Sequence, residues 1–249
     1  MLNGRASARS PQLAGPAGHL PALNAATLRR VNASDRSGSF GPASWDDRYA
    51  GDDYLFGTEA NQFLVACRDL LGGADLTTTR VLCVADGEGR NSVWLAGQGC
   101  QVDAFDPSSV AVAKARRLAE LRQVSVNYAV ADADSWAWPE DTYDVVAAIF
   151  IQFADPALRC RIYDRIAHAL KPGGLLMLEG YTVDQLQYGT GGPRSPDHLY
   201  TEEQLRAELG AFEIERLHAY HASVEEGPGH SGMSALVDVI ARRRSHGER

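Results

Sequence analysis

From Arg80 onward, short apolar runs rich in β-branched residues alternate with stretches of helical periodicity, and this alternation constrains the fold more than any other feature. It is typical of βα units, in which a helix crosses over between two parallel strands. The run 143–151 is almost continuously apolar, as expected of a strand buried on both faces. The pattern predicts an α/β protein with a doubly wound, mostly parallel sheet.

Two further runs near the C-terminus extend this sheet. The segments 212–220 and 234–241 flank a glycine-rich loop and can pair as antiparallel strands. We therefore expect seven strands, with a late antiparallel one. The other expected elements are strands at 81–85, 101–105, 124–130, 143–151 and 175–179, and helices at 91–98, 108–121, 156–170 and 201–210.

The first 43 residues differ in composition from the rest. Ala, Ser, Gly, Pro and Arg dominate there, and Asp35 is the only acidic residue. We interpret residues 1–43 as a disordered extension. An Arg-rich, acid-poor organellar targeting segment is the alternative. Since the 249-residue chain is long enough for one α/β domain with a large core, we expect a single domain over residues 44–245.

The overall charge argues against nucleic-acid partners. A formal net charge of −8 repels phosphate backbones unless a local basic face compensates. The run Arg242-Arg243-Arg244 is the nearest candidate for such a face, and we expect it to be a solvated tail. No apolar run approaches the roughly 20 residues needed to cross a bilayer. These observations predict neither a nucleic-acid partner nor a membrane span, and we expect a cytoplasmic protein.

The four cysteines are spaced far apart and form no CxxC pair. The spacing indicates neither a metal site nor a disulfide framework. Cys83 and Cys100 fall within apolar strand-like runs, so we expect both to be buried.

The first candidate site is the loop Asp86-Gly87-Glu88-Gly89, which follows a predicted strand and precedes a predicted helix. Glycines at such a position let the backbone approach a ligand, and the helix N-terminal amides face the same pocket. Taken alone, a tight turn that needs positive φ explains the glycines equally well.

Two acidic positions support a ligand-binding role for this loop. Asp106 lies nineteen residues beyond Gly87 at the end of the second strand, where a carboxylate can accept hydrogen bonds from both hydroxyls of a ribose. Asp132-Ala133-Asp134 follows the third strand, where a carboxylate and a backbone amide can contact an adenine edge. Turn or helix capping is the alternative for Asp132.

Together these features resemble the class I S-adenosylmethionine-dependent methyltransferases over residues 45–242. The family has a glycine loop after strand one, an acid ending strand two, an acid after strand three and a Pro-Gly-Gly turn before strand five. Pro172-Gly173-Gly174 matches that turn, and the stretch 138–144 matches the approach to strand four. The resemblance implies a Rossmann-like sheet, S-adenosyl-L-methionine as cofactor and methyl transfer.

A narrower resemblance is to a small bacterial group near the tellurite-resistance and thiopurine methyltransferases. It is carried by four motifs, which are Trp45-Asp46-Asp47-Arg48-Tyr49, Phe56-Gly57, Gly87-Glu88-Gly89-Arg90-Asn91 and Glu179-Gly180-Tyr181-Thr182. The cofactor-binding residues that the resemblance implies are Trp45, Arg48, Tyr49, Asp86, Gly87, Gly89, Arg90, Asn91, Asp106, Pro107, Ser108, Asp132, Ala133 and Ile149.

The resemblance also implies a role for each part of this set. Asp106 would hold the ribose, and Asp132 with Ala133 would hold the adenine. Gly87 and Gly89 would admit the methionine portion. The residues that would close the methionyl end are Trp45, Arg48, Tyr49 and Asn91.

Three positions depart from the family pattern. Cys83 stands where the first strand usually carries an acid, and Ala85 replaces the first glycine of the loop motif. Asp86 is a neighbouring carboxylate that can take the place of the missing acid. Gln152 stands where relatives often have His, which weakens the case for a base at that position.

The acceptor side is less constrained by the sequence. Methyl transfer from a sulfonium needs mainly alignment in a dry pocket, so a base is optional. A thiol or chalcogen anion needs no strong base, whereas a hydroxyl acceptor favours His or a carboxylate. The candidate substrate residues lie on loops at the strand ends and are Tyr181, Gln185, Glu226 and His230. For His230, a surface residue or a hairpin hydrogen-bond donor is the alternative.

Two other functions compete with this interpretation. The GxGxxG fingerprint of a nucleotide-dependent oxidoreductase requires a third glycine where Ser92 stands. A catalytically inactive domain of the same fold, binding adenosylmethionine or a protein partner, would explain Cys83, Ala85 and Gln152.

Overall fold

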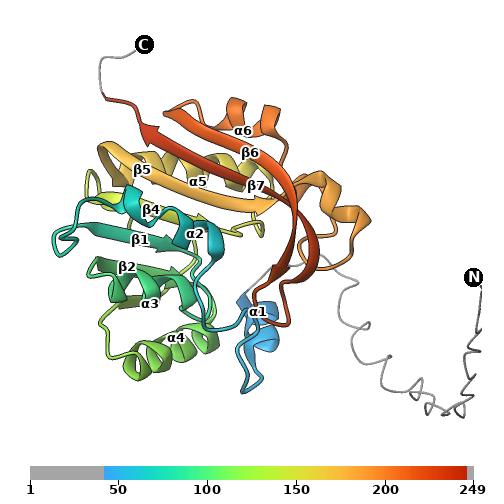
Figure 1. The fold of residues 1–249 in the computed structure, drawn as a ribbon, viewed down its shortest axis with the longest axis horizontal. Coiled ribbons are helices and arrows are strands. Elements are labelled where there is room, and N and C mark those ends of the chain that lie inside the picture. The colour runs from blue at the N-terminus through green and yellow to red at the C-terminus, as the bar shows by residue number, and fades with distance from the viewer. Residues whose placement is uncertain (1–41, 246–249) are drawn as a thin grey trace, which may run out of the picture. The chain divides into compact units, whose positions relative to one another are not determined.

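The computed structural model describes residues 42–245, and most of the predicted N-terminal extension, residues 1–41, lies outside this range. A seven-stranded sheet in the order β3-β2-β1-β4-β5-β7-β6 forms the centre (Figure 1). The strands are β1 (Arg80–Val84), β2 (Gln101–Asp106), β3 (Asn127–Val130), β4 (Tyr143–Ile149), β5 (Leu170–Tyr181), β6 (Phe212–Glu225) and β7 (Ser231–Arg243). The predicted doubly wound, Rossmann-like α/β fold is confirmed.

Helices cover both faces of this sheet and divide the core in two. The α-helices are α1 (Pro42–Tyr49), α2 (Gln62–Ala66), α3 (Arg90–Gly97), α4 (Ser109–Leu121), α5 (Pro156–Ala169) and α6 (Glu202–Glu208). Short 3-10 helices are η1 (Arg68–Leu71), η2 (Val183–Gln187) and η3 (Pro196–His198). Apolar side chains of α2, α3 and α4 pack with Val81 and Cys83 on one face. Those of α5 and α6 pack with Leu82 and Val84 on the other face.

The connections explain where a ligand can bind. The chain runs from β1 outward to β2 and β3, then returns to place β4 on the other side of β1. All four of these strands are parallel, so their carboxyl ends lie along one edge. The crevice at such a change of direction is the usual ligand site of open α/β sheets.

The C-terminal hairpin confirms the predicted antiparallel strand. β7 pairs antiparallel with both β5 and β6, and Glu179 of β5 lies opposite Asp238 of β7. The prediction of a solvated arginine tail is wrong for Arg242 and Arg243. Arg242 lies in β7 and pairs with Glu215 at 2.5 Å, while Arg243 pairs with Asp141. Arg242 and Arg243 thus have acidic partners that a run of like charges does not reveal, whereas Arg244 is exposed, as predicted.

Some element bounds differ from the sequence expectation. β3 begins at Asn127 rather than residue 124, and β5 begins at Leu170. β4 stops at Ile149 because Phe150 adopts φ +55°, a left-handed conformation that ends the strand. Such a conformation costs a bulky residue of order 1–3 kcal/mol and is found most often at functional sites. In the described part of the chain, no helix is long and apolar enough to cross a membrane.

Gly89 provides a test of this packing. It has φ +90°, and a Cβ there would lie 2.7 Å from Ala115 Cβ of α4. We expect Gly89→Ala to lower the free energy of unfolding by more than about 2 kcal/mol, because positive φ and overpacking add.

Gly97 is the matched control, since a Cβ built there meets nothing within 4 Å. We expect Gly97→Ala to raise the free energy of unfolding by up to about 1 kcal/mol. Urea denaturation measures both variants, and equal effects would contradict the packing role of Gly89.

Candidate active site

The glycine loop begins with a strained residue. Ala85, which replaces the first glycine of the motif, has φ +49°, and Gly87 and Gly89 follow at +62° and +90°. A non-glycine residue in this region costs of order 1 kcal/mol or more. Cys83 is buried, as predicted, and lies in the core between β1 and helices α2 to α4. The backbone at Ala85 therefore keeps the positive φ of the motif's first glycine, although the residue there is alanine.

Asp106 is joined directly to this loop. Its Oδ2 accepts a hydrogen bond from Gly87 N at 2.9 Å, and its Oδ1 accepts one from Ser108 N at 2.8 Å. Burial raises the pKa of Asp106 to about 6. Since each carboxylate oxygen has a second lone pair, both can accept one further hydrogen bond. Gly87 and Asp106, which are nineteen residues apart in sequence, are thus in direct contact.

Helix α1 lies against the same residues. The Tyr49 hydroxyl comes within 3.0 Å of the position that a Cβ on Gly87 would take. Asp46 Oδ1 accepts a hydrogen bond from Ser108 Oγ at 2.5 Å, which ties α1 to the start of α4. Trp45 stacks on Tyr49 with ring centroids 5.6 Å apart, and the Arg48 guanidinium lies 4.4 Å from the centre of the Trp45 ring.

A buried ion pair holds the segment that follows α1. Glu88 lies between the two loop glycines and pairs with Lys114 of α4. Glu88 Oε2 also accepts a hydrogen bond from Leu55 N at 2.7 Å, and Lys114 Nζ donates to Gly51 O and Asp53 O. We name residues 45–57, which include the end of α1 and the stretch after it, the covering segment. Glu88 and Lys114 were not predicted as site residues, because nothing in their spacing links an acid in a glycine loop to a lysine on a later helix.

The Asp86 carboxylate is held by the first turn of α3. Its carboxylate accepts hydrogen bonds from Ser92 N at 3.3 Å and from Ser92 Oγ. Ser92 Oγ also lies 2.8 Å from the Tyr128 hydroxyl. Burial raises the pKa of Asp86 to about 7. The carboxylate therefore supports the first turn of α3.

The adenine candidates lie at the far end of the same edge. Asp132 is exposed, and its Oδ1 caps a turn by accepting from Asp134 N and Ser135 N at 3.0 and 2.7 Å. Ala133 is buried, and its carbonyl accepts from Trp138 Nε1 at 2.8 Å. The capping alternative for Asp132 is thus present in the structure, and its second oxygen stays available to a ligand. Two other predicted cofactor residues, Pro107 and Ile149, are partly buried.

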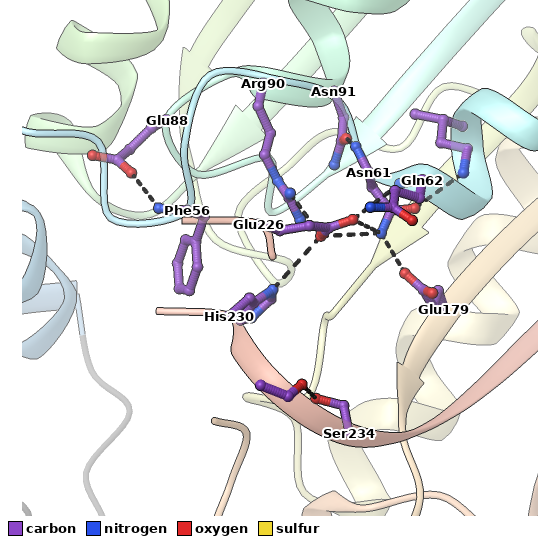
Figure 2. Close-up of polar contacts among 12 residues, drawn as sticks. Phe56, Asn61, Gln62, Glu88, Arg90, Asn91, Glu179, Glu226, His230 and Ser234 are labelled. Atoms are coloured by element: carbon purple, nitrogen blue, oxygen red, sulfur yellow. Dashed lines mark hydrogen bonds and ion pairs between the residues drawn. The ribbon is translucent and has the colours of Figure 1, made fainter. Parts of the chain in front are cut away.

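Arg90, Glu226 and His230 come together at the start of α3 (Figure 2). Arg90 Nη1 lies 2.7 Å from Glu226 Oε2, and His230 Nδ1 lies 3.9 Å from the same oxygen. Burial alone would raise the pKa of Glu226, but His230, Arg90 and the amide of Gln62 lower it to about 2. Glu226 is therefore ionised, and its carboxylate faces both the Arg90 guanidinium and the His230 imidazole.

Asn61 connects this group to the sheet. Its Nδ2 donates to Glu179 and to Glu226 Oε1, the latter at 3.2 Å, while its backbone N donates to Asn91 Oδ1 at 3.0 Å (Figure 2). Asn61 also caps α2 by accepting from Leu64 N. Asn61 and Glu179 were not predicted as members of the site, because the contacts of Asn61 with Glu179 and Glu226 cross 118 and 165 residues of chain.

Three aromatic rings surround His230. The ring centroids of Phe150, Phe56 and Tyr181 lie 4.3, 4.5 and 5.6 Å from that of His230. We name these three residues the aromatic box. His230 is only 7% exposed, so the surface alternative for this residue is wrong. Burial lowers the pKa of His230.

The loop 226–230 is packed against the covering segment. A Cβ on Gly227 would lie 2.4 Å from Gly57 N, and one on Gly229 would lie 2.5 Å from the Phe56 ring. Gly229 N donates to Leu55 O at 2.8 Å. These two glycines allow backbones about 170 residues apart in sequence to touch.

Gln185, which was predicted as a substrate residue, and Gln152 both form hydrogen bonds within the fold. Gln185 Oε1 accepts from Ala235 N at 2.8 Å, and its Nε2 donates to Thr190 Oγ1 at 3.0 Å. Gln152 holds the Tyr181 backbone from both sides, since Nε2 donates to Tyr181 O and Oε1 accepts from Tyr181 N. Tyr181 itself is buried in the aromatic box.

Residues 81–174 match the family model described as a methyltransferase domain. This stretch includes the glycine loop, Asp106 and the Pro172-Gly173-Gly174 turn. It is a class I S-adenosylmethionine-dependent methyltransferase domain. S-adenosylmethionine is therefore the cofactor of this enzyme.

Solved structures share the fold of the methyltransferase at low sequence identity. One, described in the conversion of a disulfide bond into a thioacetal group during echinomycin biosynthesis, is 19% identical with a TM-score of 0.69, and covers 83% of this chain and 93% of its own. TehB from Haemophilus influenzae is 16% identical with a TM-score of 0.59, over 82% of this chain and 67% of that one. An S-adenosylmethionine-dependent methyltransferase from Methanosarcina mazei is 19% identical with a TM-score of 0.56, over 75% and 99%. No curated protein matches the sequence significantly.

The carboxylates of the methyltransferase site make its stability depend on pH. Burial, Asp238 and Glu226 raise the pKa of Glu179 to about 8, so folded Glu179 binds a proton that the unfolded chain releases near pH 4.5. The stability from this proton is present below pH 4.5 and is lost as pH rises through 8. We expect the free energy of unfolding to fall between pH 5 and 8, by about 1 kcal/mol per pH unit where the slope is steepest.

Urea denaturation at several pH values measures this slope. Glu179→Gln should make the slope shallower, because the amide cannot ionise and still accepts from Asn61, while the raised pKa values of Asp86 and Asp106 keep part of the slope. Glu213→Gln, on the exposed side of β6, is the control and should keep the wild-type slope. An unchanged slope in Glu179→Gln would contradict the assignment.

Proposed function

We propose that this enzyme transfers a methyl group from S-adenosylmethionine to a small-molecule acceptor, and that residues 44–245 form the functional domain. The acceptor is a thiol, a chalcogen oxyanion or a small oxygen or nitrogen nucleophile. The observation that carries the proposal is the pair of hydrogen bonds from Gly87 N and Ser108 N to Asp106, which fixes a buried carboxylate beside the glycine loop.

The residues at this edge fit an adenosyl cofactor. Asp106 has a free acceptor site on each oxygen for the two ribose hydroxyls, and Asp132 with the Ala133 amide suits the adenine. The bare Cα of Gly87 and the start of α3 admit the methionine portion, with Arg90 and Asn91 nearby. Trp45, Arg48 and Tyr49 of α1 cover it. When bound, the cofactor supplies an activated methyl group on sulfur.

The acceptor site is best supported at the aromatic box. His230 lies within the box, and Glu226 lies beside His230. Phe150, one member of the box, stands at the carboxyl end of β4 and packs against Tyr181. Buried aromatic walls exclude water, as methyl transfer from a sulfonium requires. Membership in the group near the tellurite-resistance and thiopurine methyltransferases rests on the covering-segment motifs and on Glu179-Gly180-Tyr181-Thr182.

Calorimetric titration tests the cofactor site. We expect S-adenosylmethionine and S-adenosylhomocysteine to bind and NAD not to bind. Asp106→Asn should weaken binding of both sulfur nucleotides by about 1.5–3 kcal/mol, the range for hydrogen bonds to a charged group. Asp164→Asn, on the exposed side of α5, is the matched control and should bind as wild type.

Two outcomes would contradict this proposal. Binding of NAD but of neither sulfur nucleotide would favour an oxidoreductase. An unchanged dissociation constant in a folded Asp106→Asn would remove Asp106 from the ribose site. Turnover assays with thiols, selenite or tellurite, and small hydroxyl and amine compounds then identify the acceptor class.

A further inference from the structure

We propose that His230 is the general base of this methyltransferase, that Glu226 positions it, and that the acceptor is a neutral nucleophile that still carries its proton. The inference rests on the proposed function and chooses among its acceptor classes. A hydroxyl, thiol or amine fits it, and an anion such as tellurite does not.

The position of the two ring nitrogens supports a base at Nε2. Nδ1 is buried and faces Glu226 Oε2 at 3.9 Å, so a proton on Nδ1 is favoured by the carboxylate. That tautomer leaves the lone pair on Nε2. Within residues 42–245, no polar atom forms a hydrogen bond with Nε2. The 3.9 Å separation is longer than a hydrogen bond, as is common for catalytic pairs before a substrate binds.

The charges around His230 keep it neutral. Burial lowers the pKa of the imidazole most, and the cations Arg90 and Arg48 lower it further, while Glu226 raises it. The net direction is downward, so His230 is unprotonated at neutral pH. A buried, neutral imidazole whose other nitrogen faces a carboxylate is able to take a proton and have the resulting charge stabilised.

The lining of the site decides the acceptor class. Three aromatic rings surround the imidazole, and the Arg90 charge is compensated by Glu226 at 2.7 Å. Arg48 is exposed and stacks on Trp45, so water screens its charge. Because the one buried cation beside His230 among the described residues, Arg90, is already paired with Glu226, moving an anion into this site is costly. A neutral acceptor avoids that cost but needs a base.

The proton and electrons balance as follows. The acceptor proton moves to His230 Nε2, and the electron pair of that bond stays on the acceptor atom. This pair forms the new bond to the methyl carbon as the carbon–sulfur bond breaks and leaves its pair on sulfur. Glu226 stabilises the imidazolium, which later releases the proton to solvent.

The first test does not depend on turnover. The Cε1–H resonance of His230, assigned by its loss in His230→Gln, is followed by NMR across pH. We expect a midpoint below the ordinary value of about 6.5, and a still lower midpoint in Glu226→Gln because the partner that raises it is gone. An imidazole titrating above 6.5, or one unaffected by Glu226→Gln, would overturn the assignment.

The second test uses kinetics with S-adenosylmethionine and the acceptor panel. We expect His230→Gln to lower kcat by about 100-fold or more with hydroxyl, thiol or amine acceptors, and to remove the rise of kcat/KM with pH. Binding of S-adenosylhomocysteine should be unchanged. His218→Gln, on an exposed position of β6, is the matched control and should keep the wild-type rate.

The outcomes separate this inference from the proposed function. If the wild type binds neither sulfur nucleotide, the proposed function fails. If it binds them but methylates only selenite or tellurite, or none of the panel, the acceptor class is wrong. A folded His230→Gln with the wild-type rate and pH profile would show that His230 is not the base.

Discussion

The buried pair of Glu88 and Lys114 is the interaction on which the site depends. Glu88 belongs to the glycine loop, but its carboxylate points toward the covering segment, where it accepts from Leu55 N and pairs with Lys114. Removing one partner of a buried pair leaves an uncompensated charge and commonly costs 3–5 kcal/mol. Loss of Lys114 would also release its contacts to three backbone carbonyls of residues 49–53, and loss of Glu88 would release the backbone amides of Leu55 and Phe56. The loop that would hold the cofactor thus also carries the anchor for its cover.

Much of the fold could be predicted from the sequence. Apolar runs identify the central strands β1, β4 and β5, because burial on both faces of a sheet leaves a strong local pattern. The glycine loop and Asp106 could be found because each stands at a fixed point of a βα unit. Bounds were less certain where local geometry decides them. Phe150, for example, ends β4 through a left-handed conformation that its sequence context does not favour.

The rest of the site could not be predicted, because its contacts are remote in sequence. Asn61 meets Glu226 across 165 residues, and no periodicity records such a contact. The arginine tail was misread for the same reason, since Arg243 pairs with Asp141 on a distant turn. His230 stood in a glycine-rich loop, where sequence favours exposure. It is buried because Gly227 and Gly229 let that loop press against Phe56 and Gly57.

The covering segment has a consequence for how ligands bind. Its Tyr49 lies over Gly87 of the loop, and its Phe56, seven residues later, forms a wall of the aromatic box. One short stretch of chain therefore contacts both the proposed cofactor site and the proposed acceptor site. A ligand that orders this stretch from one side reduces the entropy that a second ligand must give up on the other side. Linkage makes any such coupling reciprocal, so each ligand would change the affinity for the other by the same factor.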